Sequence, residues 1–178
     1  MEKVIEEMTN ALHKIEMEHW MNHDLFSIQW WSILLLNAIL LIIFILFIDR
    51  QRILLISLAF MISYALTTVF DDIGEYFLLW SHPYQLVQFL SPLASVEFIV
   101  VPSIMALMYQ TFSKWKFYLI ADLIVVGIIS FIVQPIFVYT DLYKLHNWTY
   151  FYSFIVLFII GIIGKMVMDF IKNKQLIH

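Results

Sequence analysis

Three acidic residues, Asp71, Asp72 and Glu75, follow an apolar run and form a D-D-x-x-E cluster. Carboxylate oxygens are the ligands that hard divalent cations prefer, and a cation held by them can bind a diphosphate. The cluster therefore allows a membrane enzyme that acts on a lipid or isoprenoid substrate with a divalent metal. Such an enzyme needs a second acid cluster and cations for the diphosphate, and Lys and Arg are scarce in the surrounding segments.

The same acids continue a polar stripe on one helix face. The members of the stripe are Ser57, Tyr64, Thr68, Asp71 and Glu75, with Asp72 at its edge. Their spacing of seven, four, three and four residues places them on one side of an α-helix. In a membrane such a stripe either lines a cavity, because polar groups are costly in hydrocarbon, or hydrogen-bonds neighbouring helices while the acids emerge into water.

Two further polar residues are expected at the depth of these acids. Glu97 stands about one turn inside the third apolar run, where a carboxyl group needs a partner or a proton. Gln134, near the end of the fourth run, shares a stripe with Gly127 and Ser130. We therefore expect a cavity in the outer leaflet, lined by Tyr64, Thr68, Asp71, Asp72, Glu75, Glu97 and Gln134.

Asp122 is expected near the opposite, inner surface. The basic residues available there are Arg50, Arg52, Lys114 and Lys116. We expect an ion pair between Asp122 and one of them, because an ionised carboxylate inside a membrane needs a partner.

A weaker metal-site candidate lies near the N-terminus. His19 and His23 are four residues apart, a spacing at which two imidazoles on a helix can share one metal ion, and Asp24 is placed to complete the shell. A lone pair of this kind also occurs by chance. We therefore expect no cofactor, with a divalent metal as the alternative.

Several kinds of catalytic site are excluded by residue type. The chain contains no Cys, which excludes disulfides, thiolate metal sites and Cys nucleophiles. It also lacks a Ser nucleophile motif and a phosphate-binding loop. We assign no catalytic residue and expect a non-enzymatic protein whose cavity binds a small cation, a lipid or a partner helix.

Membrane helices are the elements that must position these residues. The 178-residue chain is 62% hydrophobic and 13% charged, with a mean hydropathy of +0.86, so its polar residues cannot cover a soluble globule. Five apolar runs are long enough for a hydrocarbon layer of ~30 Å, at residues 32–48, 53–70, 93–112, 117–138 and 150–168. The fold class is an all-α, polytopic membrane helix bundle.

Two segments outside these spans have patterns of their own. Residues 1–29 read as an amphipathic helix that lies in the outer interface or packs over the bundle, and residues 30–178 form the single bundle domain. Residues 76–92 are apolar but interrupted by Pro83 and Pro92, so we expect an interfacial or re-entrant segment.

The positions of Lys and Arg predict the orientation. Basic residues fall in alternate gaps between the apolar runs, and cytoplasmic loops collect such residues. We therefore expect a cell-membrane protein with its N-terminus outside and its C-terminus in the cytoplasm. Its partners are the lipid bilayer and a membrane protein or a second copy of the chain; no basic stripe is long enough for nucleic acid.

A series of short motifs resembles a known family. The motifs are H-D-L-F-S-I-Q-W-W at 23–31, D-R-Q-R at 49–52, Asp72-Ile73-Gly74, Leu79-Trp80, Glu97 with Pro102, Tyr109-Gln110, Trp115-Lys116 and W-T-Y-F-Y-S-F at 148–154. Between residues 23 and 168 the chain resembles a family of small, uncharacterised multi-pass membrane proteins of endospore-forming Gram-positive bacteria. The resemblance implies five spans and supplies no catalytic residue. Where the family has an acid before the proline of the fourth span, this chain has Gln134, so a mechanism that needs a carboxylate there is not expected.

Overall fold

The chain folds into helices that are joined by short turns and two longer loops. The computed structural model describes residues 1–88 and 98–175. The helices are α1 (Glu2–His19), α2 (Ile28–Phe47), α3 (Ile53–Tyr76), α4 (Val100–Thr111), α5 (Trp115–Ile128), α6 (Gln134–Tyr139) and α7 (Tyr150–Gln175). Two-residue strands β1 (Trp80–Ser81) and β2 (Lys144–Leu145) pair antiparallel, with Trp80 opposite Leu145.

Four helical segments are long and apolar enough to cross a membrane. They are Ile28–Phe47, Arg50–Tyr76, Trp115–Tyr139 and Tyr150–Lys174. The prediction of an all-α bundle of apolar helices is thus confirmed, and four of the five expected spans correspond to these segments. The expected span at 93–112 is described only from residue 98, and α4 has 12 residues, about 18 Å of helix. Residues 93–97, Glu97 included, lie outside the described residues.

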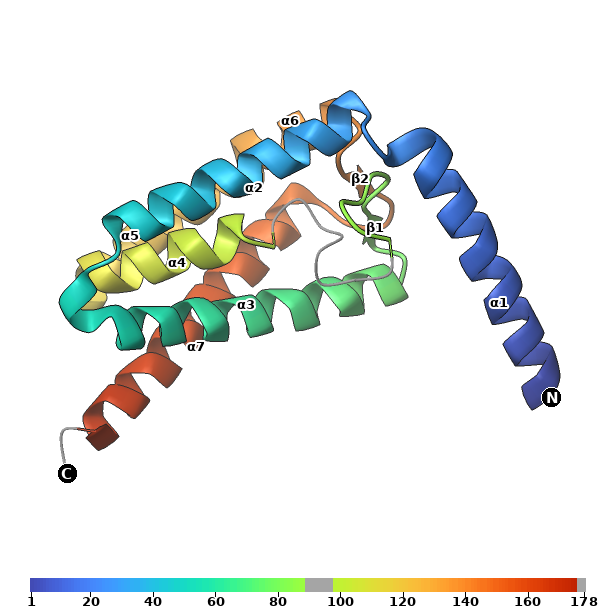
Figure 1. The fold of residues 1–178 in the computed structure, drawn as a ribbon. Coiled ribbons are helices and arrows are strands. Elements are labelled where there is room, and N and C mark those ends of the chain that lie inside the picture. The colour runs from blue at the N-terminus through green and yellow to red at the C-terminus, as the bar shows by residue number, and fades with distance from the viewer. Residues whose placement is uncertain (89–97, 176–178) are drawn as a thin grey trace.

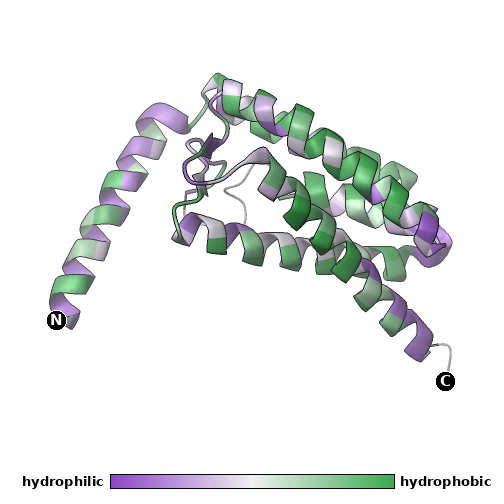
Figure 2. Ribbon diagram, turned by 180° about the vertical axis from the view of Figure 1, so that it is seen from behind, coloured by the Kyte–Doolittle hydropathy of each residue, from purple (hydrophilic) through white to green (hydrophobic). Residues whose placement is uncertain are grey.

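The helices of the bundle run between two chemically different ends (Figure 1). α3 packs on α4 and α7, α2 packs on α4, and α5 packs on α7. At one end, which we call the tryptophan end, lie Trp30, Trp80 and Trp148. At the other, which we call the basic end, lie the turn with Arg50 and Arg52 and the turn before α5. Figure 2 shows that the helices between the two ends are mostly hydrophobic.

The core and the outer surface of the bundle are both apolar. Ile56, Ala59, Met105 and Ala106 are at most 4% exposed where α3 meets α4. The outer surface of the helices also carries large apolar side chains, such as Leu46, which is 71% exposed. An apolar exterior over this length is typical of a protein whose solvent is lipid.

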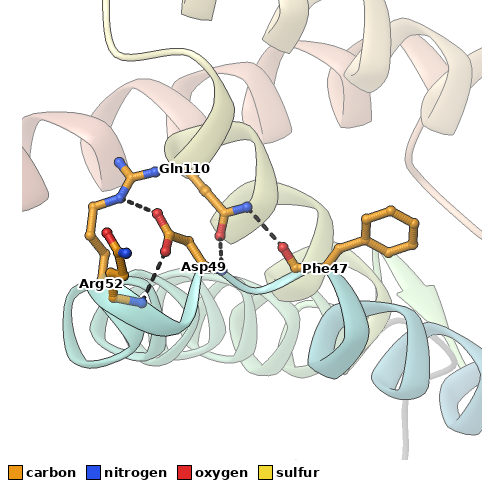
Figure 3. A network of polar contacts seen from close by, with 5 residues as sticks. Phe47, Asp49, Arg52 and Gln110 are labelled. Atoms are coloured by element: carbon orange, nitrogen blue, oxygen red, sulfur yellow. Dashed lines mark hydrogen bonds and ion pairs between the residues drawn. The ribbon is translucent and has the colours of Figure 1, made fainter.

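A glutamine from α4 holds the turn between α2 and α3 at the basic end (Figure 3). The Gln110 amide donates to the backbone carbonyl of Phe47 at 2.9 Å and accepts from the backbone N–H of Asp49 at 2.8 Å. The Asp49 carboxylate accepts from Arg52 Nε at 2.7 Å and from the Gln51 N–H at 3.0 Å. These bonds to Arg52 and Gln51 hold the pKa of Asp49 below its usual value.

Lys165 of α7 is buried at the same end of the bundle. Its side chain is 1% exposed, and its ammonium group lies 3.5 Å from Asp169 and donates to the Ser113 carbonyl at 3.3 Å. Three aromatic rings surround the ammonium group at 4.9–5.3 Å from their centroids. They belong to Tyr109, Trp115 and Tyr118. Cation–π attraction and the Asp169 carboxylate together compensate for the hydration that the ammonium group loses on burial.

The N-terminal helix α1 projects away from the tryptophan end and has no buried residue (Figure 1). Its apolar side chains, among them Ile5, Met8 and Leu12, are each more than half exposed. α1 therefore does not cover the bundle in the described structure. A π-helical turn, Trp20–Asp24, joins it to the bundle, where Trp20 Nε1 donates to the Gln85 carbonyl at 2.9 Å.

Candidate functional site

A cavity of about 60 Å³ lies near the tryptophan end, between α3, α7 and the segment that joins α5 to α6. Its polar lining consists of Thr67, Thr68, Asp71, Gln134 and Ser153. Its aromatic lining consists of Phe70, Trp80, Phe98, Tyr143 and Trp148. A space of this size holds roughly a few water molecules or one small ion with part of its hydration shell.

Asp71 is fixed by the loop that follows α3. Its Oδ1 accepts a hydrogen bond from Trp80 Nε1 at 2.9 Å, and its side chain is 28% exposed. The Trp80 ring reaches this position because Gly74 has no side chain: a Cβ built there overlaps the indole. A helical glycine one turn below the loop thus allows the indole to close over the carboxylate.

His82 lies between two carboxylates beside the cavity. Its Nδ1 is 2.7 Å from Glu75 Oε1, and its Nε2 is 3.9 Å from Asp71 Oδ1. The His82 side chain is 1% exposed, and its ring meets that of Tyr143 edge-on at 5.1 Å. The distance to Asp71 is too long for a hydrogen bond but short enough for a strong electrostatic interaction when the imidazole is protonated.

The two loops of the tryptophan end form an aromatic lid over the cavity, made of Trp80, Tyr143 and Trp148. Pairing of β1 with β2 brings the first loop to the second. The Trp80 and Trp148 rings meet edge-on at 5.0 Å, and Trp148 Nε1 donates to Ser153 Oγ at 3.0 Å. Another bond between the loops joins Ser81 Oγ to His146 Nε2 at 3.0 Å.

Gln134 supplies an amide at the opposite wall. The residue is 5% exposed, and its Oε1 has no hydrogen-bond partner in the described part of the chain. It begins α6 directly after the π-helical turn Ile129–Val133. Buried amide oxygens are normally hydrogen-bonded, so this oxygen is available to a donor or a cation that enters the cavity.

The structure brings together part of the predicted cavity. Thr68, Asp71 and Gln134 line it, and Glu75 reaches its edge through His82. Asp72 is exposed on another face of α3, and Tyr64 lies lower on the helix beside Phe60. Ligand binding by the residues that line the cavity stays a prediction.

The stripe expected on the second span is rotated relative to the observed one. The buried residues of α3 include Ile56, Ala59, Ser63 and Gly74, whereas Ser57 is exposed. Thr67, on the buried side, donates to the carbonyls of Ser63 and Tyr64. Spacing alone could not show which edge of a broad stripe faces α7.

Sequence reasoning missed the lid and its histidine. His82, Tyr143 and Trp148 lie in loops and Trp80 in a strand of two residues, where no periodicity marks a shared face. Ser153 lies in the first turn of α7, where a small hydroxyl residue carries little signal. The one available hint was the concentration of Trp residues in the segments outside the apolar runs.

The candidate metal ligands near the N-terminus come only partly together. The His19 and His23 rings lie 4.9 Å apart, and His19 Nδ1 is 3.7 Å from Asp24 Oδ1. Asp24 is 3% exposed, and burial raises the pKa of its carboxyl despite the nearby histidines. Within residues 1–88 and 98–175, no three His, Asp or Glu side chains are grouped to hold a metal ion, the acids at 71, 72 and 75 included.

Asp122 does not form the expected ion pair with Arg50, Arg52, Lys114 or Lys116. It is fully buried, and neither carboxylate oxygen has a hydrogen-bond partner among the described residues. Its side chain turns instead toward α7, where a Cβ added to Gly161 would lie 2.5 Å from both oxygens. The prediction was wrong because it considered only the depth of Asp122 in the membrane and not the direction in which its side chain points.

Comparison with known proteins adds no further constraint. No family model, curated protein or solved structure matches the chain. The resemblance to the spore-former membrane proteins therefore stays a prediction.

Proposed function

We propose that the protein is an integral membrane protein that binds a small cation in the cavity beneath the aromatic lid. The observation that carries this proposal is that one cavity is lined both by the Asp71 carboxylate and by Gln134, whose Oε1 has no hydrogen-bond partner among residues 1–88 and 98–175. A carboxylate in an aromatic, largely apolar setting attracts positive charge strongly, because little water screens it.

The hydroxyl groups of the lining also favour a cation. Thr67 Oγ1 directs its proton to the backbone carbonyls of Ser63 and Tyr64, at 2.9 and 3.0 Å, so its lone pairs remain for a ligand. The faces of aromatic rings stabilise cations further. The cavity of about 60 Å³ offers oxygen atoms and ring faces close together, and a small ion therefore fits it best among the ligands considered.

The orientation is part of the proposal. The basic end carries Arg50, Arg52, Lys114 and Lys116, and cytoplasmic loops collect such residues. The tryptophan end then faces outside, and the cavity takes its ion from the outer side of the cell membrane.

The test is a cation titration of the purified protein in lipid nanodiscs, read by the change in intrinsic tryptophan fluorescence, to which Trp80 and Trp148 at the cavity contribute. The probes are Na⁺, K⁺ and methylammonium. Asp71→Asn keeps an oxygen that accepts from Trp80 but removes the charge, and we expect it to weaken binding by about tenfold or more, ~1.4 kcal/mol. The wild type should saturate with at least one probe.

Asp72→Asn is the matched control. It removes the same charge from the neighbouring, exposed position of α3 and should change affinity by less than about twofold. Equal affinity of the wild type and Asp71→Asn, or no saturable signal with any probe, would overturn the proposed function.

A further inference from the structure

A row of buried polar groups continues from the cavity toward the middle of the bundle. Asp122 and Ser130 are fully buried and Gln134 is 5% exposed. The two oxygens of Asp122, Ser130 Oγ and Gln134 Oε1 all lack a hydrogen-bond partner in the described residues. Unsatisfied polar atoms inside a membrane protein are costly, and their grouping on one segment points to a function.

The π-helical turn keeps these groups on one face. Asp122, Val126, Ser130 and Gln134 are spaced by four residues, and each such step advances about 40° beyond a full turn of an α-helix. The turn Ile129–Val133 takes an extra residue to close, which reduces this drift. Gln134 consequently reaches the cavity, while Asp122 faces α7 about three turns nearer the basic end.

One apolar layer separates Asp122 from the cavity. Ile129 and Ile160 line the cavity, and Gly161, the residue after Ile160, contacts the Asp122 carboxylate. Val126, 1% exposed, lies between Asp122 and Ile129 on α5. A hydrophobic constriction between two polar regions is a recurring form of gate in membrane proteins.

Polar groups continue from Asp122 to the basic end. Tyr118 OH donates to the Gly161 carbonyl at 3.0 Å, and the Tyr118 ring lies 4.9 Å from the Lys165 ammonium group. Lys165 contacts Asp169, which is 29% exposed and accepts from Tyr109 OH at 3.2 Å. The titratable groups around Asp122 toward the basic end are thus Tyr118, Lys165, Asp169 and Tyr109.

We propose that Asp122 binds and releases a proton, and that the protein moves protons between the cavity and the basic end. The carboxylate is packed against the backbone of α7, which leaves room for a proton but none for a metal ion. The proton would leave the Asp71 carboxyl, pass Gln134 and the apolar layer and bind the Asp122 carboxylate, and it would then leave Asp122 for the Asp169 carboxylate, which pairs with Lys165 at the basic end. This inference shares its entry site with the proposed function but does not require a bound cation.

The test is proton flux into liposomes that contain the full chain and an entrapped pH-sensitive dye. A potassium gradient with valinomycin supplies the driving potential. We expect the wild type to acidify the lumen faster than protein-free liposomes, and Asp122→Asn to lose the flux by about a hundredfold, since a positioned proton-transfer group contributes about that much. Asp72→Asn should match the wild type.

A second measurement uses the wild-type protein and so does not depend on whether the Asp122→Asn variant folds. A membrane-soluble carbodiimide should modify Asp122 in the wild type, as read by mass spectrometry, and should stop the flux in proportion to the modified fraction. Flux that persists in Asp122→Asn, flux that survives full modification, or no flux above protein-free liposomes would each overturn the inference. Cation titration of the same Asp122→Asn protein separates the two proposals, because binding at Asp71 should persist in it.

Discussion

Gly74 shows how one residue without a side chain determines the shape of the candidate site. The Trp80 indole occupies the space where a Cβ would stand, and its Nε1 donates to Asp71 from there. The indole is 3% exposed and packs against the other rings of the lid. Any side chain at position 74 must therefore displace the lid.

We expect Gly74→Ala to lower the free energy of unfolding by about 1–3 kcal/mol, because the added methyl group overlaps a buried ring. Thermal unfolding in detergent measures this change. Gly127→Ala is the control: its Cβ would lie 3.9 Å from Phe154, in ordinary contact, and alanine is favoured in a helix by ~1 kcal/mol. Equal stabilisation by both substitutions would show that the indole is not held against α3.

At the scale of elements, the basic end depends on one side chain that joins three helices. Gln110 of α4 bonds both sides of the turn between α2 and α3 (Figure 3). The turn contains only Ile48 and Asp49 before the short 3₁₀ helix Arg50–Arg52. Its backbone groups would otherwise face the headgroup region without fixed partners.

We expect Gln110→Ala to destabilise the protein by about 1–2 kcal/mol, since it removes two hydrogen bonds. The Asp49 amide should lose its protection from hydrogen exchange. Thr111→Val, which removes only a bond to the Leu107 carbonyl within α4, should leave that amide protected. Unchanged protection in Gln110→Ala would mean that the turn is rigid without the glutamine.

At the scale of the whole molecule, the two ends differ in kind. Trp30, Trp80 and Trp148 lie at one end with the acids of the second half of α3, and the turns at the other end carry Arg50, Arg52, Lys114 and Lys116. The positive-inside rule is the basis of the proposed orientation, with the tryptophan end outside.

The orientation predicts which loops a membrane-impermeant maleimide reaches. The chain has no Cys, so a single Cys at exposed Asn147 or exposed Ser113 gives a clean label. In intact cells Asn147→Cys should react, whereas Ser113→Cys should react only after the membrane is permeabilised. The reverse pattern would place the cavity on the cytoplasmic side.

Helices were the predictable part of this molecule. The apolar run at 117–138 became the continuous helical segment Trp115–Tyr139, and the run at 150–168 became part of α7. The run at 53–70 continued to Tyr76, because Asp71 and Glu75 stay helical when they bond Trp80 and His82. Composition predicts which segments contact lipid. It does not predict where a helix ends when residues of the following loop bond the acidic side chains of its last turns.

The candidate site was predictable only where it lies on helices. Asp71, Thr68 and Gln134 follow from depth and spacing, and they do line the cavity. The pairing of Trp80 with Leu145 joins residues 65 positions apart, and only the folded chain shows it. Asp122 illustrates the same limit, since the missing side chain of Gly161 on another helix decided its direction.

Buried Lys165 has a consequence for how the chain enters the membrane during synthesis. Its charge is shielded by Asp169 on the same helix and by rings from α4 and α5, which the ribosome makes earlier. Among the described residues of α7, Asp169 is the acid that pairs with Lys165, whereas the rings belong to helices that are synthesised before α7. We therefore expect the last helix to be integrated more favourably beside α4 and α5 than alone.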